Sequence, residues 1–228
     1  VRHLLRFAVM QASVPVDDAL IDAAVKATSV SVPLSPEQEA DLWKIQNTLS
    51  ALIHPARPES VIAIDVGDYA LLIDYLQAHQ LTLTTVLITH RHHDHTNGLA
   101  ELRSKHPQIP VYGHNSIAHI THALTGGEIL NIKDFGRFLV LDTKGHTQYH
   151  LAYYHLQQKL LYCGDSLFSG GCGRIFPDGS AENSYHSLQK ISLLPEDTQV
   201  CGSHEYTLDN LAFAQHIEPN NHELINYQ

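Results

Sequence analysis

Residues 86–95 read Val86-Leu87-Ile88-Thr89-His90-Arg91-His92-His93-Asp94-His95, an apolar run followed at once by histidines and an aspartate. The apolar half predicts a buried strand. Side chains two positions apart point the same way in an extended segment, so His90 and His92 can hold one metal ion. Asp94 and His95 can turn toward a second ion where the chain enters the next helix. Imidazole nitrogens and carboxylate oxygens suit zinc, iron or manganese, so the stretch predicts a metal site at a strand end.

Three later segments place ligand-type residues where an apolar strand is expected to end. They are Gly145-His146-Thr147, Gly164-Asp165-Ser166 and His204-Glu205. Functional side chains gather on the loops at strand ends, where a rigid scaffold positions them. Two ions need more ligands than residues 90–95 supply, and these segments provide candidates for the remainder.

The expected elements alternate in a way that indicates two mixed sheets faced by helices. Hydrophobic periodicity and turn residues predict strands over 60–66, 84–89, 110–112, 137–142, 151–156, 159–163 and 199–201, and helices over 68–79, 96–106, 180–194 and 208–216. Residues 1–45 read differently, as an Ala-rich helical extension in which we find no chemistry.

The composition argues against several classes of protein. The chain has 228 residues, and 14 Lys and Arg against 24 Asp and Glu give a formal net charge of −10. An acidic chain without a basic run is poorly suited to nucleic acid. No run approaches the roughly 20 apolar residues that cross a membrane. Cys163, Cys172 and Cys201 form no C-x-x-C motif, which argues against a disulfide scaffold and favours a cytoplasmic location.

The order of the motifs resembles that of a known superfamily. His-x-His-x-Asp-His at 90–95, then Gly-His-Thr, Gly-Asp and a last His, is similar to the metallo-β-lactamase superfamily. Within it, residues 164–174 and 204–207 resemble glyoxalase II, the hydroxyacylglutathione hydrolases. Residues 210–220 are similar to the start of that family's C-terminal helical domain. The resemblance implies an α/β fold, a four-layer αββα sandwich.

The resemblance also implies a division of the chain, since it runs from about Leu49 to Asn220. We expect an N-terminal helical extension of unknown function at 1–45 and a catalytic domain at 46–205. Residues 206–228 are expected to be a short, truncated C-terminal helical segment.

A dinuclear metal site follows from the same resemblance. The first ion is expected to take His90, His92 and His146, and the second Asp94, His95 and His204, with Asp165 bridging the two. The nucleophile is then a water or hydroxide between the ions, because coordination lowers the pKa of bound water from about 15.7 to about 7. Asp94 and Asp165 are the expected catalytic residues, Asp94 also as a proton acceptor. Zinc is the expected metal, with iron or manganese as alternatives.

The resemblance implies hydrolysis of the thioester of S-2-hydroxyacylglutathione, that is, of S-D-lactoylglutathione to D-lactate and glutathione, in methylglyoxal detoxification. Arg174 follows Gly-Cys-Gly and matches a cationic residue that contacts the glycine carboxylate of glutathione. Tyr206 matches an aromatic hydroxyl that contacts the peptide. Phe176 stands where some members have tyrosine, so it lacks a hydrogen-bond donor. The expected partner is this small-molecule thioester, and a monomer is the simplest oligomeric state.

Two other functions stay open. A persulfide dioxygenase with one iron, acting on glutathione persulfide, shares the His-x-His-x-Asp-His and Gly-Cys-Gly-Arg motifs, although the segment from His204 to Thr207 looks like the hydrolase. A metal-binding remnant is the third reading, because 24 residues follow His204 here, whereas family members continue through further helices that carry basic glutathione contacts. Metal count per chain separates the first two readings.

Three residues depart from the family pattern. Lys144 and Val66 replace prolines, and Ser203 replaces the glycine before the last ligand. If that glycine serves a positive φ, a serine there is strained and is expected to displace His204. Of the histidines outside the motifs, His150 is expected to be structural or to support a ligand, and eight others, among them His155, are expected to be solvated.

Overall fold

The fold comes from a computed structural model that describes residues 50–54, 57–222 and 224. The expected N-terminal extension at 1–45 lies outside the described residues. Within them, no helix combines the length and the apolar character that crossing a bilayer requires.

The first sheet brings the C-terminal ends of two parallel strands to one edge. Its order is β1 (Ser50–His54), β2 (Arg57–Ile64), β3 (Thr82–Leu87), β4 (Val111–Gly113) and β5 (His122–Ala123). β1 pairs with β2 antiparallel, and the other three pairs are parallel. Ile64 lies opposite Leu87 at the ends of β2 and β3. The residues that follow these strands are therefore neighbours in space.

The second sheet is a meander with one parallel strand added at its edge. Its order is β10 (Gln199–Gly202), β9 (Leu160–Gly164), β8 (Leu151–His155), β7 (Gly136–Asp142) and β6 (Ile129–Ile132). β6 to β9 pair antiparallel, whereas β10 runs parallel to β9. Gly202 lies opposite Gly164, so the segments after β9 and β10 leave the sheet side by side.

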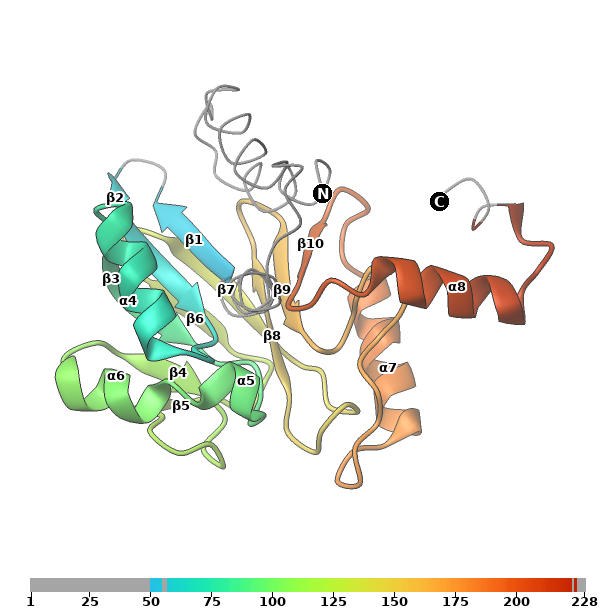
Figure 1. The fold of residues 1–228 in the computed structure, drawn as a ribbon, viewed down its shortest axis with the longest axis horizontal. Helices are drawn as coiled ribbons and strands as arrows, with labels where there is room; N and C mark the ends of the chain where they lie inside the picture. The colour runs from blue at the N-terminus through green and yellow to red at the C-terminus, as the bar shows by residue number, and fades with distance from the viewer. Residues whose placement is uncertain (1–49, 55–56, 223, 225–228) are drawn as a thin grey trace, which may run out of the picture.

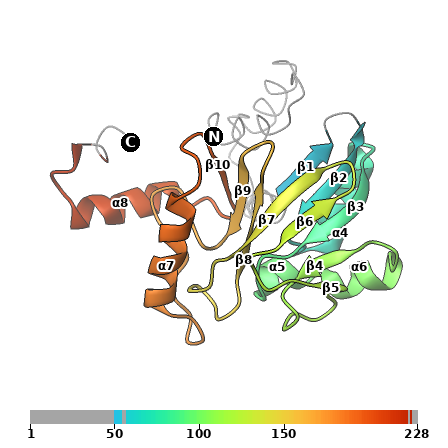
Figure 2. The ribbon, with the colours of Figure 1, turned by 180° about the vertical axis from the view of Figure 1, so that it is seen from behind.

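Helices lie on the outer faces of the two sheets, which gives four layers (Figures 1 and 2). α4 (Tyr69–Ala78) and α6 (Leu99–Lys105) bury leucines against the first sheet. α7 (Ala181–Ser192) packs Ile191 against the second sheet. α5 (His93–Thr96) is a single turn, and α8 (Thr207–Ile217) follows β10 and buries Leu211. The αββα sandwich expected from the sequence is confirmed.

The main core lies between the two sheets, because alternate side chains of each strand face the other sheet. It includes Ile62, Leu87, Phe138, Val140, Leu151, Tyr153 and Tyr162, all at most 2% exposed. Tyr153 also donates a hydrogen bond from its hydroxyl to the carbonyl oxygen of Ile88, at 2.6 Å. This bond ties β8 to the end of β3, directly before the histidine motif.

Several boundaries differ from the sequence prediction. The prediction lacks β1, β5 and β6. β5 has two exposed residues, and β6 is a largely exposed edge strand without a clean alternation of apolar and polar positions. The helix predicted over 96–106 begins at Leu99, because residues 93–96 form the separate turn α5.

His155 is buried, so the expectation that it is solvated is wrong. Its side chain forms two hydrogen bonds at the end of β8. Nε2 donates to the carbonyl oxygen of Phe135 at 2.6 Å, and Nδ1 accepts from the amide of Gln158 at 3.1 Å. Both ring nitrogens are satisfied when the imidazole is neutral.

Candidate metal centre

Three imidazoles from the predicted set converge at the end of β3. Nε2 of His90 lies 2.9 Å from Nδ1 of His92, and Nε2 of His146 lies 3.0 Å from the same atom. Together with Asp165, they offer ligand atoms that all lie within 4.8 Å of one another. His90 and His92 come from the segment after β3, and His146 comes from the segment after β7.

The other predicted residues form a second cluster beside the first. Asp94, His95 and His204 also offer ligand atoms within 4.8 Å of one another. Oδ2 of Asp94 lies 3.3 Å from Nε2 of His204 and 3.5 Å from Nε2 of His95. Asp94 and His95 lie on α5, whereas His204 follows β10. The single turn α5 therefore carries its two residues to a different cluster from the residues that precede it.

Asp165 lies between the two clusters. Its Oδ2 is 3.4 Å from Nε2 of His146, in the first cluster. Its Oδ1 is 3.2 Å from Nε2 of His95 and 3.5 Å from Nε2 of His204, in the second. All seven residues predicted as ligands are thus brought together, with Asp165 in the position expected of a bridge.

Hydrogen bonds behind the ligand atoms fix which nitrogens carry protons. Thr89 donates its hydroxyl to Oδ2 of Asp65 at 2.7 Å, so it accepts from Nδ1 of His90 at 3.0 Å. Nδ1 of His95 donates to the same Asp65 oxygen at 2.7 Å, and Nδ1 of His146 donates to the carbonyl oxygen of Arg174 at 2.7 Å. These contacts leave Nε2 of His90 and of His146 as bare acceptors facing the centre, as metal-ligating histidines require.

The two clusters differ in charge. Burial, together with His95, lowers the pKa of His90 well below its ordinary value, and burial with His146 lowers the pKa of His92 to about 4. Burial also opposes the charge on His95, but Asp65 and Asp165 raise its pKa to about 10. The imidazoles of the first cluster are therefore neutral, whereas in the second cluster His95 carries a proton that lies between two carboxylates.

The donor set fits metal ions. Nε2 of His95 is buried and has no hydrogen-bond partner among the described residues, although it faces Asp165. Nδ1 of His92 faces two acceptor nitrogens and can donate a proton to only one of them, whereas a cation can bind all three nitrogens. A cation near His95 can likewise replace its proton. The first cluster offers three imidazoles and a carboxylate, and the second offers two imidazoles and carboxylates. Both sets match the ligands that zinc, iron and manganese take in proteins. The fold and this cluster suggest a dinuclear site.

Gly173 allows the loop after β9 to close on the centre. Its amide donates to the carbonyl oxygen of Asp165 at 2.9 Å. A Cβ at this position would collide with that oxygen and lie 2.7 Å from Nδ1 of His146. The loop can therefore cover the ligands only with glycine at this position.

A cavity of about 560 Å³ opens onto both clusters. Its lining includes His92, His146, Asp94, His204 and Asp165, and the three predicted substrate residues Arg174, Phe176 and Tyr206. The guanidinium of Arg174 lies over the ring of Phe176 at 4.3 Å. Tyr206 stacks on His204, with ring centroids 5.3 Å apart. The predicted substrate contacts thus lie beside the centre, where a molecule reaching the ligands would meet them.

Ser203 is not strained, so the expectation that it displaces His204 is wrong. Five described non-glycine residues have a positive φ, and Ser203 is not among them. Its hydroxyl instead donates a hydrogen bond to Oδ1 of Asp165 at 2.6 Å. His204 keeps its place in the second cluster.

Sequence reasoning missed Asp65 as part of the centre. Its carboxylate accepts from the amide and hydroxyl of Thr89 and from His95, and its φ of 64° is unusual for a residue other than glycine. The signal was present, because Asp65 follows the apolar strand β2 in the way that the other ligand-type residues follow their strands.

His150, which is buried nearby, accepts a hydrogen bond from the Asp165 amide at 3.2 Å and thereby supports the loop after β9.

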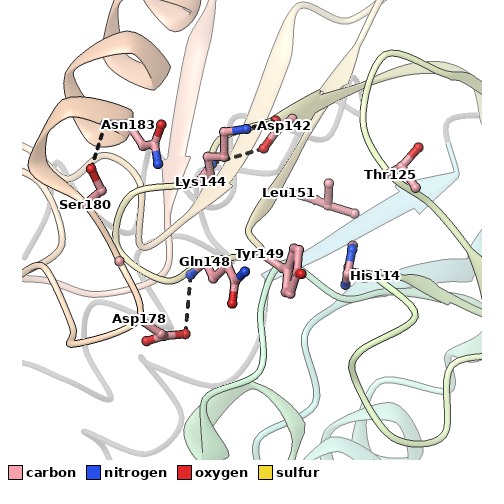
Figure 3. A pocket seen from close by; sticks show the side chains of 11 residues that line it. His114, Thr125, Asp142, Lys144, Gln148, Tyr149, Leu151, Asp178, Ser180 and Asn183 are labelled. Carbon is pink, nitrogen blue, oxygen red and sulfur yellow. Dashed lines mark hydrogen bonds and ion pairs between the residues drawn. The ribbon is translucent and has the colours of Figure 1, made fainter.

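A separate cavity of about 570 Å³ lies at the start of α7 (Figure 3). The ring of Tyr149 stacks on His114 there, and Lys144 forms an ion pair with Asp142 at 3.3 Å. Asp178, also in the lining, is paired with Arg91 at 2.9 Å. These charged groups satisfy one another, and none of the predicted ligands lines this cavity.

Comparison with known proteins agrees with the geometry. The model of the metallo-beta-lactamase superfamily matches residues 48–204, well over half of the chain. Among solved structures, a B3 metallo-beta-lactamase named BLEG-1 has a TM-score of 0.62 at 28% identity, covering 76% of this chain and 90% of that one. A protein crystallised in a di-iron-bound form has a TM-score of 0.57 at 25% identity, covering 68% and 85%.

Curated relatives identify the family within this superfamily. The hydroxyacylglutathione hydrolase of Halorhodospira halophila is 47% identical over 167 residues, which are 72% of this chain and 64% of that protein. The chain thus spans less than two thirds of the length of this relative. The hydroxyacylglutathione hydrolase of Shewanella pealeana is 42% identical over 199 residues, 86% of this chain and 73% of that protein. The chain therefore belongs to the metallo-beta-lactamase superfamily and, within it, to the hydroxyacylglutathione hydrolase family.

Proposed function

We propose that this chain hydrolyses the thioester bond of S-2-hydroxyacylglutathione, with S-D-lactoylglutathione as the representative substrate. The observation that carries the proposal is the cavity that joins both ligand clusters to Arg174 and Tyr206. The names of the relatives support the same reaction. Two divalent ions, zinc first and iron or manganese as alternatives, are held by His90, His92, His146, Asp94, His95, His204 and the bridging Asp165.

Such ions supply Lewis-acid activation of water and of a carbonyl group. The chain itself supplies a proton acceptor, Asp94, whose carboxylate is about half exposed in the cavity. A hydrogen bond from His204 lowers the pKa of Asp94, so this carboxylate is ionised at neutral pH and has an oxygen available to accept a proton. The two clusters pack closely around Asp165, and this packing holds the metal ligands and the Asp94 carboxylate in fixed positions.

Substrate recognition is assigned to the wall of the cavity. Arg174 is exposed there and carries a charge that complements the glycine carboxylate of glutathione. Tyr206 is 39% exposed, so its hydroxyl is free to meet the peptide. Phe176 contributes a ring that supports Arg174.

The test is turnover of S-D-lactoylglutathione, followed by loss of thioester absorbance, with the chain loaded with zinc, iron or manganese. We expect turnover, and we expect Arg174→Gln to raise KM about tenfold to a hundredfold, because a hydrogen bond to a charged group is lost. Arg137→Gln, which removes an exposed arginine on β7 away from the cavity lining, is the matched control and should keep the wild-type KM.

Two results would contradict the proposal. A folded chain with two bound ions and no turnover would favour a metal-binding protein without this activity. One iron per chain with oxygen uptake on glutathione persulfide would favour the dioxygenase, a reading that the names of the curated relatives do not support.

A further inference from the structure

Ser203 lies between strand β10 and His204, at the edge of the second cluster. Its hydroxyl donates to Oδ1 of Asp165 at 2.6 Å, the usual length of a charge-assisted hydrogen bond from a hydroxyl to a carboxylate. The side chain is half-buried, and the same strand end supplies both this donor and His204. A charge-assisted hydrogen bond to a largely buried carboxylate restricts the rotation of that carboxylate.

The bond is made to one particular oxygen of Asp165. Oδ1 faces His95 and His204, at 3.2 Å and 3.5 Å, whereas Oδ2 faces His146 at 3.4 Å. The hydroxyl of Ser203 therefore acts on the oxygen that belongs to the second cluster. A carboxylate oxygen has two lone-pair directions, so Oδ1 can accept from Ser203 and still offer a lone pair to an ion.

The first cluster has its own supports, which do not involve Ser203. Thr89 contacts His90, and the carbonyl oxygen of Arg174 accepts from His146. In the second cluster, Asp65 holds His95. Ser203 holds the carboxylate that the second cluster shares with the first.

We propose that Ser203 is a positioning residue for the second metal ion, the one assigned to Asp94, His95 and His204. Its hydroxyl holds Oδ1 of Asp165 toward this ion. The inference rests on the dinuclear site of the proposed function, but it concerns metal affinity and not turnover. Hydrogen-bond partners behind metal ligands typically contribute 10–100-fold to affinity, and the effect here is confined to one of the two ions.

The experiment is a titration of the metal-free chain with Zn²⁺ against a chromophoric chelator, which yields two stepwise affinities. Ser203→Ala and Ser203→Gly both remove the hydroxyl, and each should weaken one step about tenfold while leaving the other step unchanged. Ser203→Thr keeps a hydroxyl and should restore the weakened step. The matched control is Ser192→Ala, which removes a hydroxyl that donates to the carbonyl oxygen of Gln189 at 2.8 Å, within α7.

Three outcomes would overturn the inference. Unchanged affinities in both hydroxyl-free variants would contradict it and leave the proposed function standing. Equal weakening of both steps would mean that Ser203 supports the loop in general. A wild-type chain that binds fewer than two Zn²⁺ would contradict both the inference and the proposed function. Circular dichroism of each variant shows that it is folded before its affinities are compared.

Discussion

Asp65 accepts three hydrogen bonds at the back of the candidate metal centre. The amide and hydroxyl of Thr89 donate to it at 2.7 Å each, and Nδ1 of His95 donates at 2.7 Å. Through Thr89 it also orients His90. One carboxylate, 7% exposed, therefore sets the tautomer of a histidine in each cluster. A buried carboxylate in this position acts on both clusters although it binds in neither.

We expect Asp65→Asn to weaken Zn²⁺ binding about 10–100-fold, because the amide keeps the shape but loses the charge and one acceptor oxygen. The measurement is the chelator titration of the metal-free chain. Asp74→Asn, which removes an exposed carboxylate on α4, is the matched control. If Asp65→Asn binds two Zn²⁺ with wild-type affinity, the tautomers are fixed by other contacts.

Single residues could be predicted where their type is chemically unusual. His90, His92, Asp94 and His95 stood out because an interleaved acid among histidines follows an apolar strand. Asp65 was missed because the predicted strand runs through it to Val66, whereas β2 ends at Ile64 and leaves Asp65 at the strand end. Ser203 was misread as strain, since the sequence gives a residue type at a position but not the backbone angle there.

At the scale of elements, strand ends bring the ligands together. β2 and β3 end side by side, and so do β9 and β10. Their apolar runs made all four predictable. β5 and β6 were not, because two exposed residues and a half-covered edge strand carry little periodic signal. Both lie away from the segments that supply the ligands, so missing them did not affect the predicted site.

The end of β8 supports a prediction about pH. Burial lowers the pKa of His155, which stays neutral in the folded chain between Phe135 and Gln158. The unfolded chain takes up a proton at this residue near pH 6.5, so folding stability is present above that pH and is lost as the pH falls.

We therefore expect His155→Gln, which retains a donor for the Phe135 carbonyl, to flatten the pH dependence of unfolding. The slope of unfolding free energy against pH, just below about pH 6.5, should fall by up to about 1.4 kcal/mol per pH unit. Chemical denaturation of the metal-free chain measures it. His216→Gln, an exposed histidine on α8, should keep the wild-type slope. An unaltered slope in His155→Gln would mean that this imidazole is protonated in the folded chain.

At the scale of the molecule, the candidate centre lies where the two sheets meet. His90, His92, Asp94 and His95 follow the first sheet's β3, whereas His146, Asp165 and His204 follow strands of the second sheet. The sandwich was predictable because the strand runs and helices indicate two covered sheets. The pairing of β10 parallel to β9, which places His204, is a long-range contact that local periodicity does not encode.

Ions at this position should stabilise the whole fold, because they join groups from both sheets. Zn²⁺ at about 100 times its dissociation constant stabilises the folded state by about 2.7 kcal/mol per site. For a chain of this size, that raises the unfolding midpoint by about 5–10 °C. Thermal unfolding with and without chelator measures the shift.

The Zn²⁺-dependent rise in the unfolding midpoint should require the metal ligands of both sheets. It should not depend on how many histidines the chain contains. His204→Gln removes a nitrogen from the second sheet's contribution, so Zn²⁺ can no longer join the sheets fully at the second cluster. We expect the Zn²⁺-dependent rise to shrink in this variant. His186→Gln, an exposed histidine on α7, should show the full rise. An equal rise in both variants would mean that His204 does not contribute to Zn²⁺ binding at the second cluster.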